Sequence, residues 1–192
     1  MERSRSKGST GSPADAKFPT IIFLHDCNGP EGPQGPLFAY LNENGFAVIA
    51  PNSFARGDRP KLCSSANHWL DEVRMAEISF ALSQVRQLRW VDQRNLFLMG
   101  QGEGGEYAAR YDGTEFQGRI ASGAVCDRGQ GRRTPLLVIV SRSDAVLKGV
   151  GMKCEGADMF IEIAGSAHWV WLYPESRKAL LDFLLEHMVW GR

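Results

Sequence analysis

Residues 95–111, NLFLMGQGEGGEYAARY, contain the pattern that decides the fold. An apolar run, Leu96–Met99, is followed by a glycine-rich turn that starts at Gly100 and then by a helix-forming segment, Glu103–Tyr111. Short apolar runs bounded by polar or glycine residues are typical of buried strands, and glycines after such a run indicate a tight turn. The stretch therefore predicts a buried strand that turns sharply into a helix.

The same alternation of apolar runs and amphipathic segments continues in both directions along the chain. We expect the other buried strands at Thr20–Leu24, Ala47–Ala50, Arg119–Ala124, Leu136–Val140 and Met159–Ile163. We expect the other helices at Leu37–Glu43, Trp69–Leu88 and Glu175–Met188. This pattern predicts an α/β fold with a doubly wound, mostly parallel sheet of about six strands, helices on both faces and no large cap domain.

Length and composition limit the classes of partner. The 192 residues fit one domain, which we place at residues 18–192, after a predicted disordered leader or linker at residues 1–17. Lys plus Arg and Asp plus Glu both number 22, so no basic field favours nucleic acid. No apolar run reaches the roughly 18–20 residues of a membrane helix, and the first residues lack the apolar region of a signal peptide. We therefore expect neither a nucleic-acid nor a membrane partner.

The glycine-rich turn allows two interpretations. A strand, the sequence G-x-S-x-G and a helix form the nucleophile elbow of α/β-hydrolases, and Gly100, Gly102 and Gly104 reproduce it with glycine at the nucleophile position. Gly100, Gly102 and Gly105 also satisfy the G-x-G-x-x-G pattern of dinucleotide-binding proteins. That pattern belongs to the first βαβ unit, whereas two predicted strands precede this one, and Glu103 would place a carboxylate against the pyrophosphate. The hydrolase interpretation is favoured.

An acid and a histidine follow later strands in the order that α/β-hydrolases use. Asp144 comes after the predicted strand Leu136–Val140, and His168 comes after Met159–Ile163. An imidazole at this place can take the proton of a nucleophile if a carboxylate holds its other nitrogen. Taken alone, such a histidine is more often structural and such an aspartate more often a loop cap. Their joint order predicts an Asp144–His168 pair.

The loop after the first strand, HDCNGPEG, is expected to complete the site. In this fold that loop and the residue after the nucleophile each supply a backbone N–H to an oxyanion hole. Asp26 and Cys27 are the candidates for the first N–H, of which we take Cys27, and Glu103 supplies the second. Asp26 and Trp169, which follows His168 directly, are expected to contact substrate.

The chain resembles a known family, the dienelactone hydrolase-like branch of the α/β-hydrolase superfamily. The resemblance covers most of residues 18–190 and rests on the segments FLHDCNGPEG, APNSFARGDRP, LRWVDQRNLFLMGQGEGG, PLLVIVSRSDA and AGSAHWV. It implies a Ser or Cys nucleophile with an Asp and a His, and hydrolysis of a small ester or lactone without a cofactor. Asp144 and His168 match the acid and the base, and His25-Asp26 stands where the family has His-Gly.

Gly102 departs from that family because it stands where the nucleophile should be. The resemblance therefore implies a hydrolase scaffold that is inactive or strongly impaired as written. The alternative is a natural pseudoenzyme that binds a small ligand or a protein partner through the former active-site pocket. Displaced nucleophiles are a further alternative, although none of the candidates stands between flanking glycines: Cys27, Cys126, Ser141 and Ser143.

The four cysteines allow three complete pairings. Cys27 with Cys63 and Cys126 with Cys154 are favoured, because each pair falls in one half of the fold. Such bridges would indicate a periplasmic or secreted protein, and four free thiols a cytoplasmic one. No C-x₂-C pair occurs, so we expect no metal site. The segment 51–68 is the best candidate to cover the active site.

Overall fold

The computed structural model describes residues 16–57, 59, 63, 68–124, 133–148, 154 and 156–190. These residues form a six-stranded sheet of strand order β2-β1-β3-β4-β5-β6, in which all neighbouring strands are parallel. The strands are β1 (Phe18–Leu24), β2 (Ala47–Ile49), β3 (Val91–Gln101), β4 (Gly118–Ser122), β5 (Leu136–Ser141) and β6 (Met159–Ile163). The predicted parallel α/β sheet is confirmed. Nearly all of the leader predicted at residues 1–17 lies outside the described residues.

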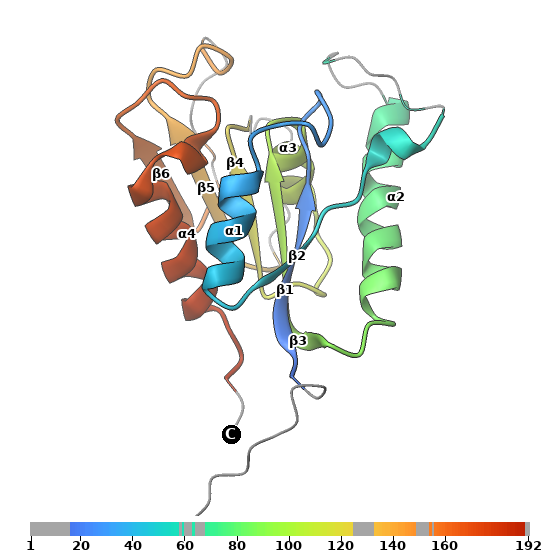
Figure 1. Cartoon of the computed structure of the whole chain (residues 1–192). Helices are drawn as coiled ribbons and strands as arrows, with labels where there is room; N and C mark the ends of the chain where they lie inside the picture. The colour runs from blue at the N-terminus through green and yellow to red at the C-terminus, as the bar shows by residue number, and fades with distance from the viewer. Residues whose placement is uncertain are drawn as a thin grey trace, which may run out of the picture.

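Helices cover both faces of this sheet, as Figure 1 shows. One face carries α1 (Gly35–Glu43) and α4 (Pro174–Glu186), and the other carries α2 (His68–Val85) and α3 (Glu103–Arg110). Two short 3₁₀ turns, η2 (Ser53–Ala55) and η3 (Val170–Leu172), lie in the connections. The expected doubly wound arrangement is therefore present.

Side chains of each strand alternate between two hydrophobic cores. On β1, Ile21 and Phe23 pack with α1 and α4, whereas Ile22 and Leu24 pack with α2 and α3. All four are at most 1% exposed. Burial on both faces explains why the strands appear in the sequence as continuous apolar runs, and each such side chain contributes about 1.5–3 kcal/mol.

The observed elements differ from the predicted ones at their ends. β3 begins at Val91 rather than Leu96, because the polar residues before the apolar run also belong to the strand. β4 ends at Ser122 rather than Ala124, because Gly123 has a positive φ of 53° and leaves the extended conformation. Strand ends depend on pairing partners, which apolar runs alone do not reveal.

The strand order places the functional end of the sheet. The chain moves from β1 outward to β2, returns to β3 on the other side of β1, and then continues outward to β6. The connection after β1 leads to α1 on one face, and the connection after β3 leads to α3 on the opposite face (Figure 1). Ligands of open α/β sheets bind at the carboxyl ends of two such strands. Asp26 and Gly102 stand there.

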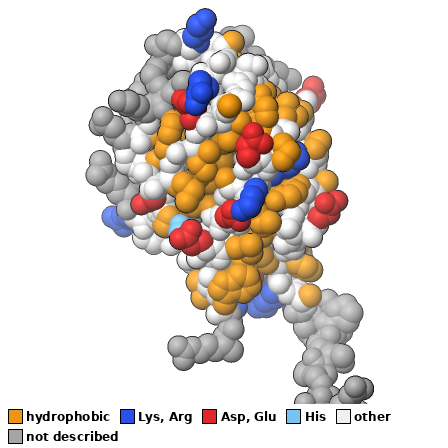
Figure 2. Space-filling model, turned by 90° about the vertical axis from the view of Figure 1, so that its left-hand side faces the viewer, with side chains coloured by type: hydrophobic (Ala, Val, Ile, Leu, Met, Phe, Trp, Pro, Cys, Tyr) orange, Lys and Arg blue, Asp and Glu red, His pale blue; other side chains and the backbone are white. Residues whose placement is uncertain are grey.

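The side of the molecule formed by α4 and β6 carries hydrophobic side chains between charged ones (Figure 2). Because β6 is an edge strand, Met159 and Phe160 remain 37% and 39% exposed. Among the described residues, none of the helices combines the length and the apolarity that a membrane-crossing segment needs.

Candidate active site

Gly102 forms the predicted turn between β3 and α3. Its φ of 52° and ψ of −121° are strained for any residue with a side chain. Its N–H donates to the Ser122 carbonyl at 2.8 Å, and its carbonyl accepts from the Glu106 N–H at 3.1 Å. The chain therefore turns sharply from β3 into α3 at a residue that has no side chain.

Close packing of α3 against the strand ends requires the neighbouring glycines. A Cβ on Gly100 would lie 2.1 Å from the Gly104 carbonyl oxygen, and a Cβ on Gly104 would lie 2.2 Å from the Leu24 carbonyl oxygen. This approach brings the first turn of α3 directly against the end of β1. The N–H of Glu103 consequently points into the loop that follows β1.

The carboxylate of Asp26 accepts that N–H. Its Oδ1 receives hydrogen bonds from the backbone N–H of Cys27 at 2.7 Å and of Glu103 at 3.0 Å. These are the two groups that the sequence assigned to an oxyanion hole, and the structure brings them together around one oxygen atom. Asp26, which the sequence predicted as a substrate contact, thus accepts hydrogen bonds from both N–H groups. A pyrophosphate at the same helix N-terminus would have to displace it, which disfavours the dinucleotide alternative.

Asp26 also fills the space that a side chain at position 102 would need. A Cβ built on Gly102 would lie 2.2 Å from Asp26 Oδ1 and 2.5 Å from its Cγ. Real Cβ atoms essentially never approach other atoms so closely. The two departures from the family pattern, Gly102 and Asp26, are therefore one feature in space: a carboxylate from the β1 loop stands where the elbow side chain would be.

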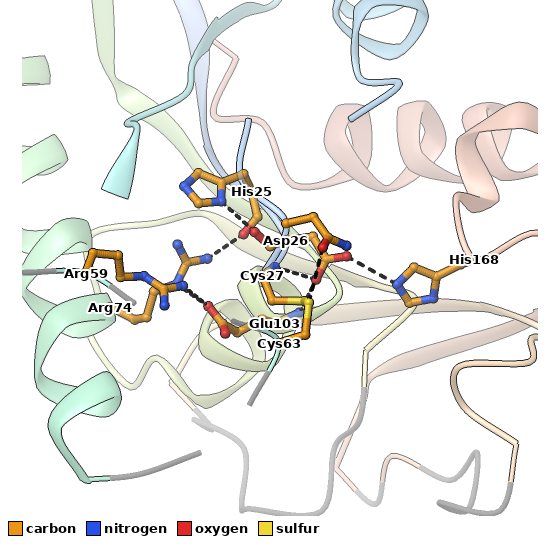
Figure 3. The surroundings of a disulfide bond; sticks show 9 residues. His25, Asp26, Cys27, Arg59, Cys63, Arg74, Glu103 and His168 are labelled. Atoms are coloured by element: carbon orange, nitrogen blue, oxygen red, sulfur yellow. Dashed lines mark hydrogen bonds and ion pairs between the residues drawn. A yellow bond between two sulfur atoms is a disulfide. The ribbon is translucent and has the colours of Figure 1, made fainter. Parts of the chain in front are cut away.

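His168 faces this carboxylate from the opposite side (Figure 3). Its Nδ1 lies 2.8 Å from Asp144 Oδ2, and its Nε2 lies 3.6 Å from Asp26 Oδ2. Asp144 is only 2% exposed, and its other oxygen accepts the Val146 N–H at 2.9 Å. The predicted Asp144–His168 pair is thus in contact, with the second imidazole nitrogen directed at Asp26.

Three side chains hold the loop that carries His168. Gln101 Nε2 donates to the His168 carbonyl at 2.9 Å, and Ser141 Oγ donates to the Ala167 carbonyl at 2.6 Å. Tyr173 Oη accepts the N–H groups of two loop residues. The half-buried ring of Trp169 crosses to the β1 loop, where it would lie 2.5 Å from a Cβ on Gly32.

The two charged partners stabilise each other's ionised forms. Burial raises the pKa of Asp26, but the contact with His168 and the backbone N–H groups of Glu103 and Cys27 together bring that pKa below its usual value. Burial lowers the pKa of His168, but Asp26 and Asp144 raise it above its usual value. The two carboxylates therefore favour the protonated form of His168, and His168 favours the ionised form of Asp26.

His25 lies on the other side of Asp26 in a different environment. Its Nδ1 donates to the Asp26 carbonyl at 2.6 Å, and its Nε2 accepts from the Ser53 N–H at 3.1 Å. Burial first, and then the cations Arg74 and Arg59, lower the pKa of His25 to about 4. This neutral histidine joins the β1 loop to η2 and does not face His168 (Figure 3).

A buried network of two arginines and two glutamates surrounds His25, and the sequence analysis did not predict it. Arg74 is 0% exposed and donates to Glu77 Oε2 at 2.8 Å, to Ser53 Oγ at 3.3 Å and to the carbonyl of His25 at 2.6 Å. Arg59 bonds the side chain of Glu103. The available signal was an arginine within the apolar stripe of α2, three residues before a glutamate.

A disulfide joins Cys27 to Cys63 beside these groups (Figure 3). Cys154 is also disulfide-bonded, whereas its predicted partner Cys126 lies outside the described residues. Cys27 therefore has no free thiol to act as a displaced nucleophile. Of the predicted cover at 51–68, the structure describes residues 51–57, 59, 63 and 68. Within the described part of the chain, no three His, Cys, Asp or Glu side chains are grouped to hold a metal ion.

No family model and no curated protein sequence matches this chain. Solved structures do match it. DcsB, in complex with a substrate analogue, is 14% identical with a TM-score of 0.68, over 90% of this chain and 92% of DcsB. The S-formylglutathione hydrolase FrmB of Staphylococcus aureus is 15% identical with a TM-score of 0.63, over 88% and 82%. A Klebsiella pneumoniae protein assigned to the dienelactone hydrolases is 17% identical with a TM-score of 0.61, over 90% and 87%. At these identities the similarity shows the α/β-hydrolase fold.

Proposed function

We propose that this protein is a hydrolase scaffold for small carboxylic esters or lactones whose serine chemistry is silenced. The observation that carries the proposal is the Asp26 carboxylate, which sits between two backbone N–H groups and His168, in the place of an elbow side chain. The supporting parts are the turn at Gly102 and the Asp144–His168 contact. The described residues thus retain an acid, a base and two convergent N–H donors.

Two separate obstacles oppose ester hydrolysis through the elbow. Gly102 has no hydroxyl or thiol, and removal of a triad nucleophile lowers turnover by roughly 10⁶-fold. Asp26 in addition occupies both N–H donors with a negative charge. A substrate carbonyl has no free donors there, and the oxyanion that it develops would be repelled by the carboxylate.

A pseudoenzyme that binds a small ligand or a partner at this site is the second candidate. The observation in its favour is that Asp26 pairs with both oxyanion N–H groups and with His168, so the polar groups of the site are satisfied without substrate. Trp169, half-buried beside His168, offers an apolar contact to such a ligand.

The experiment compares the wild type, Gly102→Ser and Asp26→Gly/Gly102→Ser in hydrolysis of p-nitrophenyl acetate and in labelling by a fluorophosphonate. We expect activity and labelling only in the double variant, because the single variant retains the carboxylate that crowds position 102. Addition of His168→Ala to the double variant should abolish both signals. A double variant that is folded yet no more active than the wild type would overturn the hydrolase scaffold and favour the pseudoenzyme.

A further inference from the structure

We propose that Asp26 is a displaced carboxylate nucleophile with which the wild-type site hydrolyses small epoxides to diols. One carboxylate oxygen is held by the N–H groups of Cys27 and Glu103, and the other faces His168 Nε2 at 3.6 Å. This inference rests on the scaffold proposed above and not on any esterase activity. It explains why a glycine at the elbow coincides with a carboxylate from the neighbouring strand.

The arrangement of the two oxygens selects the type of electrophile. Oδ1 already occupies the N–H donors, so a substrate carbonyl attacked by Asp26 would develop its oxyanion without stabilisation. Attack by Oδ2 on a saturated carbon develops no such oxyanion and gives an alkyl ester of Asp26. Hydrolysis of that ester places the oxyanion on Oδ1, where the two N–H donors lie. The N–H groups of Cys27 and Glu103 thus stabilise the oxyanion that forms on Asp26 itself when its ester is hydrolysed.

The first step balances with the groups present. Oδ2 of Asp26 donates an electron pair to a ring carbon of the epoxide, a C–O bond forms, and the ring C–O bond breaks. The ring oxygen leaves as an alkoxide and takes a proton from the His168 imidazolium, which the contact with Asp144 orients. The products are a hydroxyalkyl ester of Asp26 and a neutral imidazole.

The second step regenerates the site. Neutral His168 takes a proton from water while the water oxygen attacks Cγ of the Asp26 ester. The tetrahedral intermediate carries its negative charge on Oδ1, between Cys27 and Glu103. Its collapse breaks the bond between Cγ and the former Oδ2, which departs with the diol and takes a proton from His168. The remaining carboxylic acid passes its proton to His168, which restores the ion pair.

The charge state of the site favours epoxides among electrophiles with a saturated carbon. His168 lies between two carboxylates, with Nε2 3.6 Å from Asp26 Oδ2 and Nδ1 2.8 Å from Asp144 Oδ2. Both carboxylates favour its protonated form, because they raise its pKa against the lowering effect of burial. An epoxide oxygen needs that proton as it leaves, and its departure leaves His168 neutral, as the second step requires. A halide leaving group needs no proton, so His168 would remain charged when a base is needed.

The experiment uses the full wild-type chain and styrene oxide. In one turnover with excess protein in H₂¹⁸O, we expect phenylethanediol without label and one ¹⁸O in the peptide that contains Asp26. Label in the diol from the first turnover, or no diol above the uncatalysed rate, would overturn the proposal. This measurement needs no variant, so a folding defect cannot obscure it.

Asp26→Asn provides the matched variant, because its amide oxygen can still accept the two N–H groups. We expect a loss of at least about 10³-fold in diol formation, as for removal of other nucleophiles. Asp182→Asn, at an exposed ion pair on α4, should be unchanged. Equal activity of Asp26→Asn and wild type, or turnover of 1-chlorobutane in place of the epoxide, would overturn the assignment. Esterase activity in Asp26→Gly/Gly102→Ser does not involve Asp26, so the two proposals fail independently.

Discussion

The two histidines beside Asp26 occupy regions of opposite character. His25 is 1% exposed, lies near Arg59 and Arg74, and has its pKa lowered to about 4, mainly by burial. His168 is partly exposed, contacts Asp26 and Asp144, and has a raised pKa. The surroundings therefore favour the neutral form of the imidazole in one region and its charged form in the other. The charged and polar groups around a histidine, more than the residue type, thus determine which protonation state is favoured.

Glu103 belongs to both regions. Its backbone N–H bonds Asp26, and its side chain lies against Arg59 and Arg74. Arg59 and Arg74 thus help to fix the residue whose backbone N–H bonds Asp26. The predictions below test how strongly the arginine region and the acid–base region depend on each other.

Arg74→Met should have the largest effect. It removes the ion-pair partner of buried Glu77, one of the two arginines beside Glu103, and the hydrogen bond to the carbonyl of His25. Breaking a buried ion pair from one side costs about 3–5 kcal/mol, which urea unfolding would measure. Arg142→Met, at an exposed pair with Glu162, is the control and should change stability by less than about 1 kcal/mol. Equal losses in the two variants would contradict a supporting role for the network.

Removal of the disulfide that joins the two regions should have the next largest effect. Cys27 and Cys63 are separated by 36 positions, and closing a loop of this size contributes about 2–4 kcal/mol through the unfolded chain. We expect Cys27→Ser/Cys63→Ser to unfold at lower urea by that amount. In dithiothreitol the wild type also loses the bridge, so the difference between the two proteins should vanish. A difference that persists under reduction would show that the substitutions act by another route.

Gly102→Ser should cost about 1–3 kcal/mol, because a side chain there is both strained and too close to Asp26. Asp26→Gly should relieve the crowding, so the double variant should be more stable than the sum of the single effects predicts. A double-mutant cycle in urea measures this coupling. Gly35→Ser is the control, since a Cβ at Gly35 meets no atom within 4 Å. If the effects of the two substitutions were additive, Asp26 would not crowd a side chain at position 102.

The smallest effect concerns the titration of the two histidines, which NMR follows residue by residue. We expect His25 to titrate at about 4 and His168 above its usual value. Asp26→Asn should lower the pKa of His168, because it removes one of the two carboxylates that raise it. Asp182→Asn should leave both titrations unchanged, and a shift of His168 in that control would argue against a local cause.

The two titrations give opposite dependences of stability on pH. The raised pKa of His168 stabilises the fold fully below about 6.5, the unfolded value, and the contribution is lost as the pH rises through the folded pKa. The lowered pKa of His25 stabilises the neutral form, so its contribution is present above about 6.5 and is lost as the pH falls toward about 4. His25→Asn should therefore flatten the acid side of the stability profile and leave the alkaline side in place.

Much of the fold could be predicted because parallel strands buried on both faces appear as continuous apolar runs. The order of the turn at Gly102, Asp144 and His168 also placed them at one end of the sheet. The position of Asp26 in the oxyanion hole could not be read in the same way, because it depends on how β1 and β3 align at their ends. Two departures from the family pattern, at residues 26 and 102, were the available signal, and only the structure shows that they share one volume.

The arginine region could not be predicted because its members come from four separate segments. Arg59 follows η2, Arg74 lies on α2, Glu103 opens α3 and His25 directly follows β1. The periodicity of apolar residues shows which face of a helix is buried. A charged residue on that face cannot be interpreted from the sequence, because its partners come from distant segments. The ends of β3 and β4 were missed for a related reason, since pairing extends a strand beyond its apolar run.

Because Asp26 and a side chain at position 102 would share one volume, the order of substitutions at these two positions matters in evolution. A lineage that first gains serine at position 102 passes through a crowded intermediate, whereas one that first replaces Asp26 by glycine opens the space and leaves two N–H groups for water. Selection against instability therefore favours the second order. The form with Asp26 and Gly102 differs from the form with glycine at position 26 and serine at position 102 by two substitutions. Neither form therefore converts readily into the other by a single substitution.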